Sequence, residues 1–95
     1  MNSILQSTKE CLICGRKNGL DKHHVFFGAG LREKSEQYGL TVWLCHKEHH
    51  IFGENAVHVN AAECKQLQAW SQHKAMKHYK WTTEDFISIF RKNYL

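Results

Sequence analysis

The stretch Asp21-Lys22-His23-His24-Val25-Phe26 places two adjacent histidines in a short extended run, and the other chemically distinctive residues lie on either side of it. Cys11 and Cys14 precede the run, separated by two residues, and Cys45-His46-Lys47-Glu48-His49-His50 follows it. Thiolate and imidazole groups gathered in this way are typical of metal ligands. The sequence therefore predicts a metal site that holds the chain together around the histidine pair.

The length of the chain, 95 residues, predicts one domain, residues 1–95, with a core over about residues 11–60 and a helical tail over about residues 61–95. So small a domain buries a thin core and often depends on a metal or a disulfide, and this chain carries four cysteines and eight histidines. The sequence shows no apolar run that could cross a membrane and no secretory leader, so we expect no membrane partner and a cytoplasmic location. In that reducing compartment, thiolates bind metal rather than form disulfides.

Local patterns predict an α+β fold, with two strands and a short helix followed by a tail of two helices. Residues 1–10 are polar and lack periodicity, which predicts a loose lead-in. Gly39 suits the position after the short helix. Thr82 and Asp85 suit a capping pair at the start of the last helix. Cys64 falls on the apolar stripe of the long helix and is interpreted as a core residue. The expected elements are strands 20–27 and 40–45, and helices 31–38, 60 to about 79, and from 82 onward.

The cysteines before and after the histidine pair predict a structural zinc site. Zinc takes four ligands in a tetrahedron, and Cys11, Cys14 and Cys45 supply three thiolates. His49 lies one helical turn beyond Cys45 and is the favoured fourth ligand. The alternatives for that position are His46 and His50.

The zinc frame, the histidine pair and the histidines after the second strand resemble the HNH endonuclease family, also called ββα-metal or His-Me finger nucleases. A narrower resemblance, to phage recombination-enhancement nucleases of the RecA-dependent type, rests on these segments: His23-His24, Tyr38-Gly39-Leu40, Trp43-Leu44-Cys45, His49-His50, Val57-His58 and Phe90-Arg91-Lys92-Asn93-Tyr94-Leu95. The resemblance covers about residues 11–95. It implies a zinc-stapled ββα-metal core and a metal-dependent DNA endonuclease or nickase of phage or prophage origin, linked to recombination or DNA processing, in the cytoplasm of a bacterial host.

The matched positions imply that His24 is the general base and that His23, His50 and His58 bind a catalytic metal, while His49 completes the zinc site. A neutral imidazole can accept a proton from water near neutral pH, and a divalent ion neutralises charge on the leaving oxygen. The catalytic metal is expected to be Mg²⁺ or Mn²⁺. Zn²⁺ and Ni²⁺ are alternatives because imidazole ligands suit transition metals.

The chain departs from the family pattern at the middle asparagine, whose place is occupied by Tyr38-Gly39-Leu40-Thr41. That asparagine helps to orient the general base in the family, so the match does not identify the residue that orients His24. The candidates are a backbone carbonyl, Asn55 or Asn60. In addition, adjacent residues of a strand point to opposite faces, so both histidines reach one site only if the strand bends or ends there.

Basic residues and the formal net charge of +4 fit an acidic partner. The residues expected to contact phosphates are Lys22, Arg32, Lys34 and Lys47. Such contacts carry no sequence information, so we expect DNA to be bound with little sequence specificity. A recombinase filament is a further candidate partner through the resemblance. Two rival functions are a zinc-stapled nucleic-acid-binding module without catalysis and a purely structural adaptor.

Overall fold

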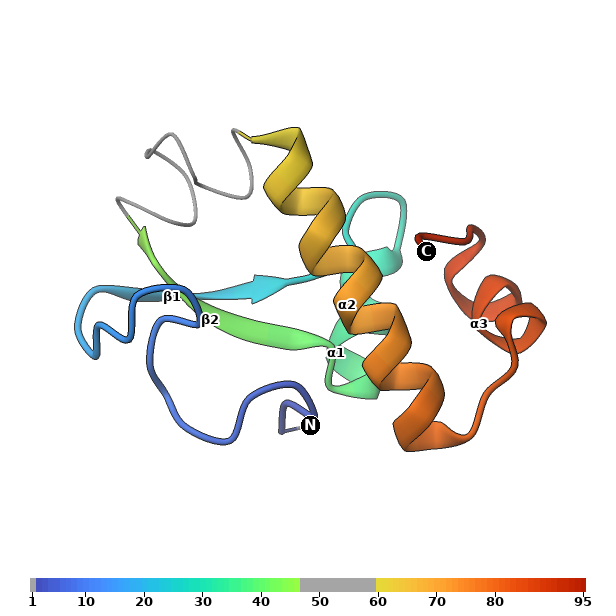
Figure 1. Cartoon of the computed structure of the whole chain (residues 1–95), viewed down its shortest axis with the longest axis horizontal. Helices are drawn as coiled ribbons and strands as arrows, with labels where there is room; N and C mark the ends of the chain where they lie inside the picture. The colour runs from blue at the N-terminus through green and yellow to red at the C-terminus, as the bar shows by residue number, and fades with distance from the viewer. Residues whose placement is uncertain (1, 47–59) are drawn as a thin grey trace.

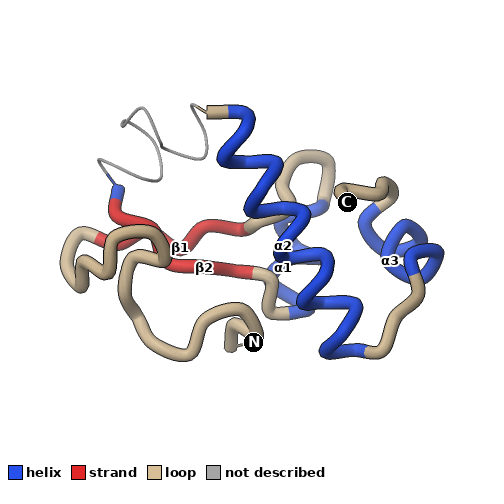
Figure 2. Tube along the Cα trace, in the orientation of Figure 1, coloured by secondary structure: helices blue, strands red, loops and turns tan. Residues whose placement is uncertain are grey.

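The computed structural model describes residues 2–46 and 60–95. Its elements follow one another as β1 (Leu20–His24), α1 (Leu31–Tyr38), β2 (Thr41–Cys45), α2 (Ala61–Tyr79) and α3 (Thr83–Phe90) (Figure 1). The two strands form a small antiparallel sheet, and the helices gather at one end and across one side of it (Figure 2). The predicted α+β class is therefore confirmed. Within the described ranges, no helix combines the length and the apolar character that crossing a membrane requires.

The register of the sheet decides which side chains share a face. His23 lies opposite Val42, and His24 lies opposite Thr41. Residues directly opposite each other point to the same side, and successive residues alternate. One side, called here the core face, carries Asp21, His23, Val42 and Leu44. The other side, called here the His24 face, carries Lys22, His24, Thr41, Trp43 and Cys45.

The core lies between the core face and the helices. Leu44 of the sheet and Leu67 of α2 line one groove, and the Gln68 Nε2 donates to the backbone oxygen of Val25 at 3.2 Å. The ring of Phe26, just beyond β1, is fully buried. Its centroid lies 5.4 Å from that of Phe86, 4.9 Å from that of Phe90 and 4.7 Å from that of Tyr94. The aromatic side chains of α3 and of the segment after it therefore pack onto the end of the sheet.

The three helices begin within one residue of the positions that the sequence predicts. Gly39 follows α1 with a φ of 72°, a conformation that glycine adopts without strain. The Asn60 side chain accepts from the first amides of α2, which satisfies donors that the helix itself cannot pair. Thr82 and Asp85 form a capping box at the start of α3. The predictions for Gly39, Thr82 and Asp85 are confirmed, and the Asn60 cap was not predicted.

The first residues differ from the loose lead-in that the sequence predicts. Ile4 N donates to Gly39 O at 2.9 Å, and the Ser3 hydroxyl donates to Thr41 O. Gln6 Oε1 accepts from Trp43 N at 2.8 Å. Side-chain oxygens thus replace the ladder bonds that a third strand would make, so the segment lies along the edge of β2 that β1 does not use. Hydrophobic alternation, the usual signal of a strand, is not needed for such an attachment.

The first strand is also shorter than predicted: it ends at His24 and not at Phe27. The buried Ser35 hydroxyl of α1 accepts from Phe26 N at 3.0 Å and donates to Phe26 O at 2.7 Å. One side chain therefore satisfies both backbone groups of Phe26, and these groups leave the ladder.

Candidate metal centre and histidine–carboxylate cluster

The Cys11-x-x-Cys14 turn is closed by its own backbone and fixed beside β2. Gly15 N donates to Cys11 O at 2.9 Å, and Cys11 N donates to Arg16 O at 2.8 Å. Gly15 has a φ of 77°, which lets the chain turn under the two sulfurs. Leu12 N donates to Trp43 O at 2.9 Å, so the turn is held two residues from Cys45 on β2.

This arrangement brings three thiols together. The ligand atoms of Cys11, Cys14 and Cys45 all lie within 4.8 Å of one another, and Cys14 Sγ is 3.8 Å from Cys45 Sγ. Four sulfurs bound tetrahedrally at about 2.3 Å from one zinc ion would stand about 3.8 Å apart. Over residues 2–46 and 60–95, no other group of three or more His, Cys, Asp or Glu side chains is placed to hold an ion. The three predicted thiolate ligands are therefore in position for a structural metal.

The electrostatics of Cys11 favour the thiolate that a metal needs. Burial by itself raises the pKa of the Cys11 thiol. Hydrogen bonds from the backbone amides of Cys14, Cys45 and Ile13, and from the Cys14 thiol, outweigh burial and lower the pKa from 9.0 to about 6. Amides that converge on sulfur also stabilise the charge of a bound metal–thiolate group.

The fourth ligand is not decided by the described residues. His49, the favoured candidate, and His50 lie outside them. His46, the other alternative, hydrogen-bonds through Nδ1 to Asp21 Oδ2. Cys64, interpreted as a core residue, is partly buried on α2 and does not belong to the cysteine group. Burial raises the pKa of its thiol, in contrast to Cys11.

On the His24 face, a second polar group forms between β1 and α1. Nε2 of His24 lies 3.1 Å from Oε2 of Glu36, and the Lys22 ammonium donates to Oε1 of the same carboxylate at 2.8 Å. The His24 side chain is 19% exposed. The hydrogen bond from Lys22 is the largest cause that lowers the pKa of Glu36, partly opposed by burial, so the carboxylate is ionised at neutral pH.

The Glu36 carboxylate determines which nitrogen of His24 carries the proton. An ionised carboxylate can only accept hydrogen bonds, so Nε2 of neutral His24 is the N–H and Nδ1 bears the lone pair. A carboxylate that orients an imidazole in this way also stabilises the imidazolium formed when the ring takes up a proton. Glu36 is thus a hydrogen-bonding partner that orients His24, whereas Asn60 caps α2 and Asn55 lies outside the described residues.

The two histidines of the pair are not brought together. β1 is regular through His24, and His23 lies on the core face, opposite Val42 and only 2% exposed. Its ring contacts that of Phe27 edge-on, with centroids 6.0 Å apart. The bend that would direct both imidazoles to one metal is absent from β1. His50 and His58, the other ligands implied by the resemblance, lie outside the described residues.

The residues predicted to contact phosphates differ in their surroundings. Lys22 is bound to Glu36, while Arg32 and Lys34 are exposed on α1. Lys47 lies outside the described residues.

Glu36 was not predicted from the sequence. The available signal was its place on the predicted 31–38 helix, whose short connections return it to the first strand, where Lys22 and His24 share a face.

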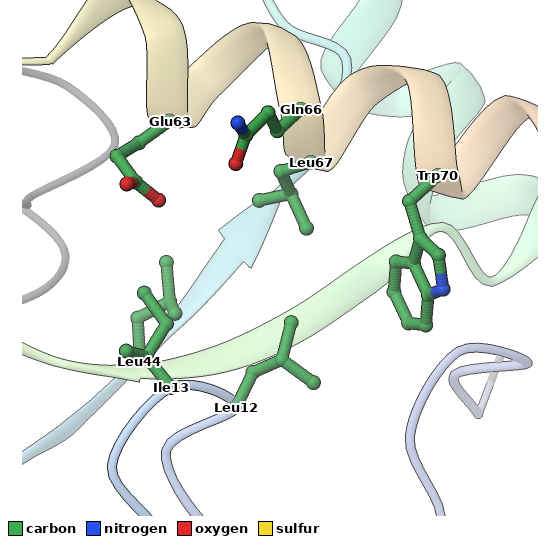
Figure 3. Close-up of a pocket in the computed structure, with 7 residues that line it drawn as sticks. All are labelled: Leu12, Ile13, Leu44, Glu63, Gln66, Leu67 and Trp70. Atoms are coloured by element: carbon green, nitrogen blue, oxygen red, sulfur yellow. The ribbon is translucent and has the colours of Figure 1, made fainter.

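A groove of 310 Å³ separates the cysteine turn from α2 (Figure 3). Figure 3 shows Leu12 and Leu44 below and Leu67 above, with Glu63 and Gln66 on the helix and Trp70 at one end. The groove is mainly apolar and lies next to the cysteine turn, through Leu12 and Ile13.

Comparisons with known proteins gave no significant match. No protein-family model matches the chain, and no curated protein or solved structure is significantly similar to it. The described residues themselves provide a site for a metal on three cysteines and, on the sheet face that carries Cys45, a carboxylate-oriented histidine.

Proposed function

We propose that this protein is a zinc-stapled, metal-dependent endonuclease or nickase that hydrolyses DNA phosphodiester bonds, with His24 as the general base. The observation that carries the proposal is the contact of 3.1 Å between Nε2 of His24 and the carboxylate of Glu36. It is supported by the cysteine group on the same sheet face and by the resemblance of the sequence to HNH nucleases, including those of phage recombination.

The chemistry assigned to His24 is proton removal from the attacking water. Nδ1 accepts the proton as the water oxygen bonds to phosphorus, and the Glu36 carboxylate stabilises the resulting imidazolium. Lys22 keeps Glu36 ionised, so that Glu36 does not take the proton from Nε2. A divalent ion, when bound, supplies charge neutralisation at the phosphate and at the leaving 3′ oxygen.

The ligands of that catalytic ion are proposed to be His50 and His58. The ion is Mg²⁺ or Mn²⁺, with Zn²⁺ or Ni²⁺ as alternatives. We leave His23 out of this group because it is buried on the opposite face of the sheet. The structural ion is proposed to be zinc on Cys11, Cys14, Cys45 and His49.

The decisive experiment compares the wild type with His24→Ala in a plasmid-nicking assay with Mg²⁺, Mn²⁺ or Ni²⁺. We expect the variant to lose at least about a hundred-fold in rate, as general bases contribute about 10²–10⁴-fold. Its zinc content and circular dichroism should match those of the wild type. His78→Ala is the matched control, because His78 is exposed on α2. Wild-type protein that never nicks plasmid with any of these ions would refute the nuclease proposal.

A second candidate is a zinc-stapled nucleic-acid-binding module without catalysis. The observation in its favour is that His23 and His24 point to opposite faces, so that the described strand provides one imidazole and not two to any catalytic metal. It predicts tight binding of one zinc ion per chain and DNA binding without cleavage. Metal analysis distinguishes the candidates, because a second, exchangeable metal is expected only for the nuclease.

A further inference from the structure

We propose that Trp43 and Lys9 form a subsite for one unpaired nucleotide on the His24 face, which makes single-stranded nucleic acid the substrate class. The role of the subsite in substrate binding rests on the proposed nuclease activity. The binding itself does not, and it is tested without cleavage.

The subsite is a cavity of 440 Å³ between the N-terminal segment and β2. Its lining is polar apart from one aromatic ring and consists of Asn2, Ser3, Gln6, Ser7, Thr8, Lys9 and Trp43. The Lys9 ammonium lies 4.5 Å from the centroid of the Trp43 ring. A flat aromatic face, a cation and several small polar groups therefore meet in one hollow.

The walls of the cavity are fixed by hydrogen bonds that do not involve a ligand. Both backbone polar groups of Trp43 are hydrogen-bonded, since its N–H donates to Gln6 Oε1 and its carbonyl accepts from Leu12 N. The Ser3 hydroxyl accepts from Leu5 N at 3.0 Å and from Gln6 N at 3.2 Å. A preformed wall lowers the ordering cost of binding.

The cation is the more exposed partner of the pair. Lys9 is exposed, so its ammonium can move from the ring of Trp43 to a phosphate when a base takes the ring face. Base stacking on aromatic side chains, together with lysine contacts to the backbone, is how proteins bind single strands without reading their sequence. The bases of a duplex are stacked on each other and hide these faces, so the geometry favours an unpaired nucleotide.

The subsite also lies close to the proposed base. Trp43 is opposite Lys22, and His24 is diagonal to Trp43 on the same face. Diagonal neighbours in an antiparallel pair stand about 7–8 Å apart. A nucleotide stacked on Trp43 therefore presents a neighbouring phosphate toward His24.

The chain contains a matched control for this pair. Lys74 lies 5.5 Å from the ring centroid of Trp70, so α2 carries a second lysine–tryptophan contact. Trp70, however, lines the apolar groove of Figure 3, on the core-face side of the sheet, rather than a polar cavity. Trp70→Leu removes an equally large ring without touching the His24 face.

The test is equilibrium binding of the zinc-loaded full chain to a fluorescent oligothymidylate of about twelve nucleotides, a length within the site sizes of single-strand binders. Anisotropy is measured without added divalent ion and repeated with a duplex of equal length. We expect Trp43→Leu to weaken binding about ten-fold or more, Trp43→Phe to weaken it less, and Trp70→Leu to leave it unchanged. Lys9→Met should reduce the slope of log K against log salt by about 0.7.

The outcomes separate this inference from the proposed function. Equal weakening by Trp43→Leu and Trp70→Leu, or binding by folded Trp43→Phe and Lys9→Met that matches the wild type in affinity and salt slope, would overturn the subsite. So would preference for the duplex, or a wild type that does not bind the oligonucleotide. The expected pattern in a protein that never cleaves DNA would support the subsite while the nuclease proposal failed.

Discussion

Glu36 joins α1 to β1 through His24, with 3.1 Å between Oε2 and Nε2, and its other oxygen holds Lys22. One carboxylate therefore sets the orientation of the imidazole and is itself kept ionised. This relationship makes Glu36 a positioning residue for the proposed base.

Glu36→Gln tests that role. The amide keeps the size of the side chain but loses the charge that stabilises imidazolium, and it can donate to Nε2 and thereby favour the wrong tautomer of His24. We expect the nicking rate to fall at least about ten-fold, because orienting partners of functional histidines are typically worth this much or more.

The control for Glu36→Gln is Glu33→Gln, which changes an exposed residue of the same helix. The role of Glu36 is excluded if both variants keep the wild-type rate. Comparison of kcat with KM separates an effect on the base from an effect on binding.

Removal of the proposed structural metal should unfold the sheet and the cysteine turn. A bound ion would offset the negative charge of the three neighbouring thiolates, and its removal would leave that charge uncompensated. We expect a strong chelator to remove about one equivalent of zinc per chain and to abolish the cooperative thermal transition. Cys11→Ser should do the same, while Cys64→Ser retains zinc because Cys64 stands outside the group.

Acid should release this metal at a pH set partly by Cys11. Its pKa is lowered to about 6, so the folded protein holds the thiolate at neutral pH and the unfolded chain does not. A lowered pKa stabilises the fold fully above the unfolded value, and this contribution is lost as the pH falls from 9.0 toward about 6. Zinc release followed with a colorimetric chelator should therefore be steep below pH about 6. Release centred above pH 8 would contradict this account.

Ser35→Ala tests the clamp at the end of β1. The variant leaves Phe26 N and Phe26 O buried without their partner. We expect the free energy of unfolding to fall by about 1–3 kcal/mol, the usual cost of unsatisfied buried groups. Urea denaturation measures the change, and Ser88→Ala, at an exposed site on α3, should stay within about 0.5 kcal/mol of the wild type.

Gln72→Ala tests how the C-terminal residues are held. The buried Gln72 side chain donates to Asn93 Oδ1 at 2.9 Å and accepts from Tyr94 N at 2.6 Å. Loss of both bonds should destabilise the fold by about 1–3 kcal/mol and speed hydrogen exchange of the Tyr94 amide. Gln66→Ala, exposed on the same helix, serves as the comparison. Unchanged exchange at Tyr94 in Gln72→Ala would show that the aromatic contacts alone hold this segment.

Sequence reasoning was most successful where the determining interactions are local. Gly39, Asn60 and the Thr82–Asp85 pair act within a few residues of the helix ends that they set, so the residue types alone predict the boundaries. The grouping of Cys11, Cys14 and Cys45 was also predictable, because thiolate spacing reflects the demands of one small ion.

The features that the sequence did not predict depend on tertiary contacts. Glu36 becomes a partner of His24 only after α1 has folded back on β1, and no spacing rule links the two. The shortening of β1 likewise depends on the hydroxyl of Ser35. Placement of His23 and His24 on opposite faces did follow from strand geometry, but only the register showed which one faces the core.

The attachment of the N-terminal segment has a consequence for how the protein behaves in solution. A Cβ at Gly39 would lie 2.6 Å from Asn2 O, so these first residues press directly against the turn before β2. Without them, the Thr41 carbonyl and the Trp43 amide at the outer edge of β2 would lose their partners, and exposed strand edges recruit strands from other molecules. A chain shortened to start at Cys11 should therefore self-associate as its concentration rises. By covering this edge of β2, residues 2–10 protect the protein against aggregation.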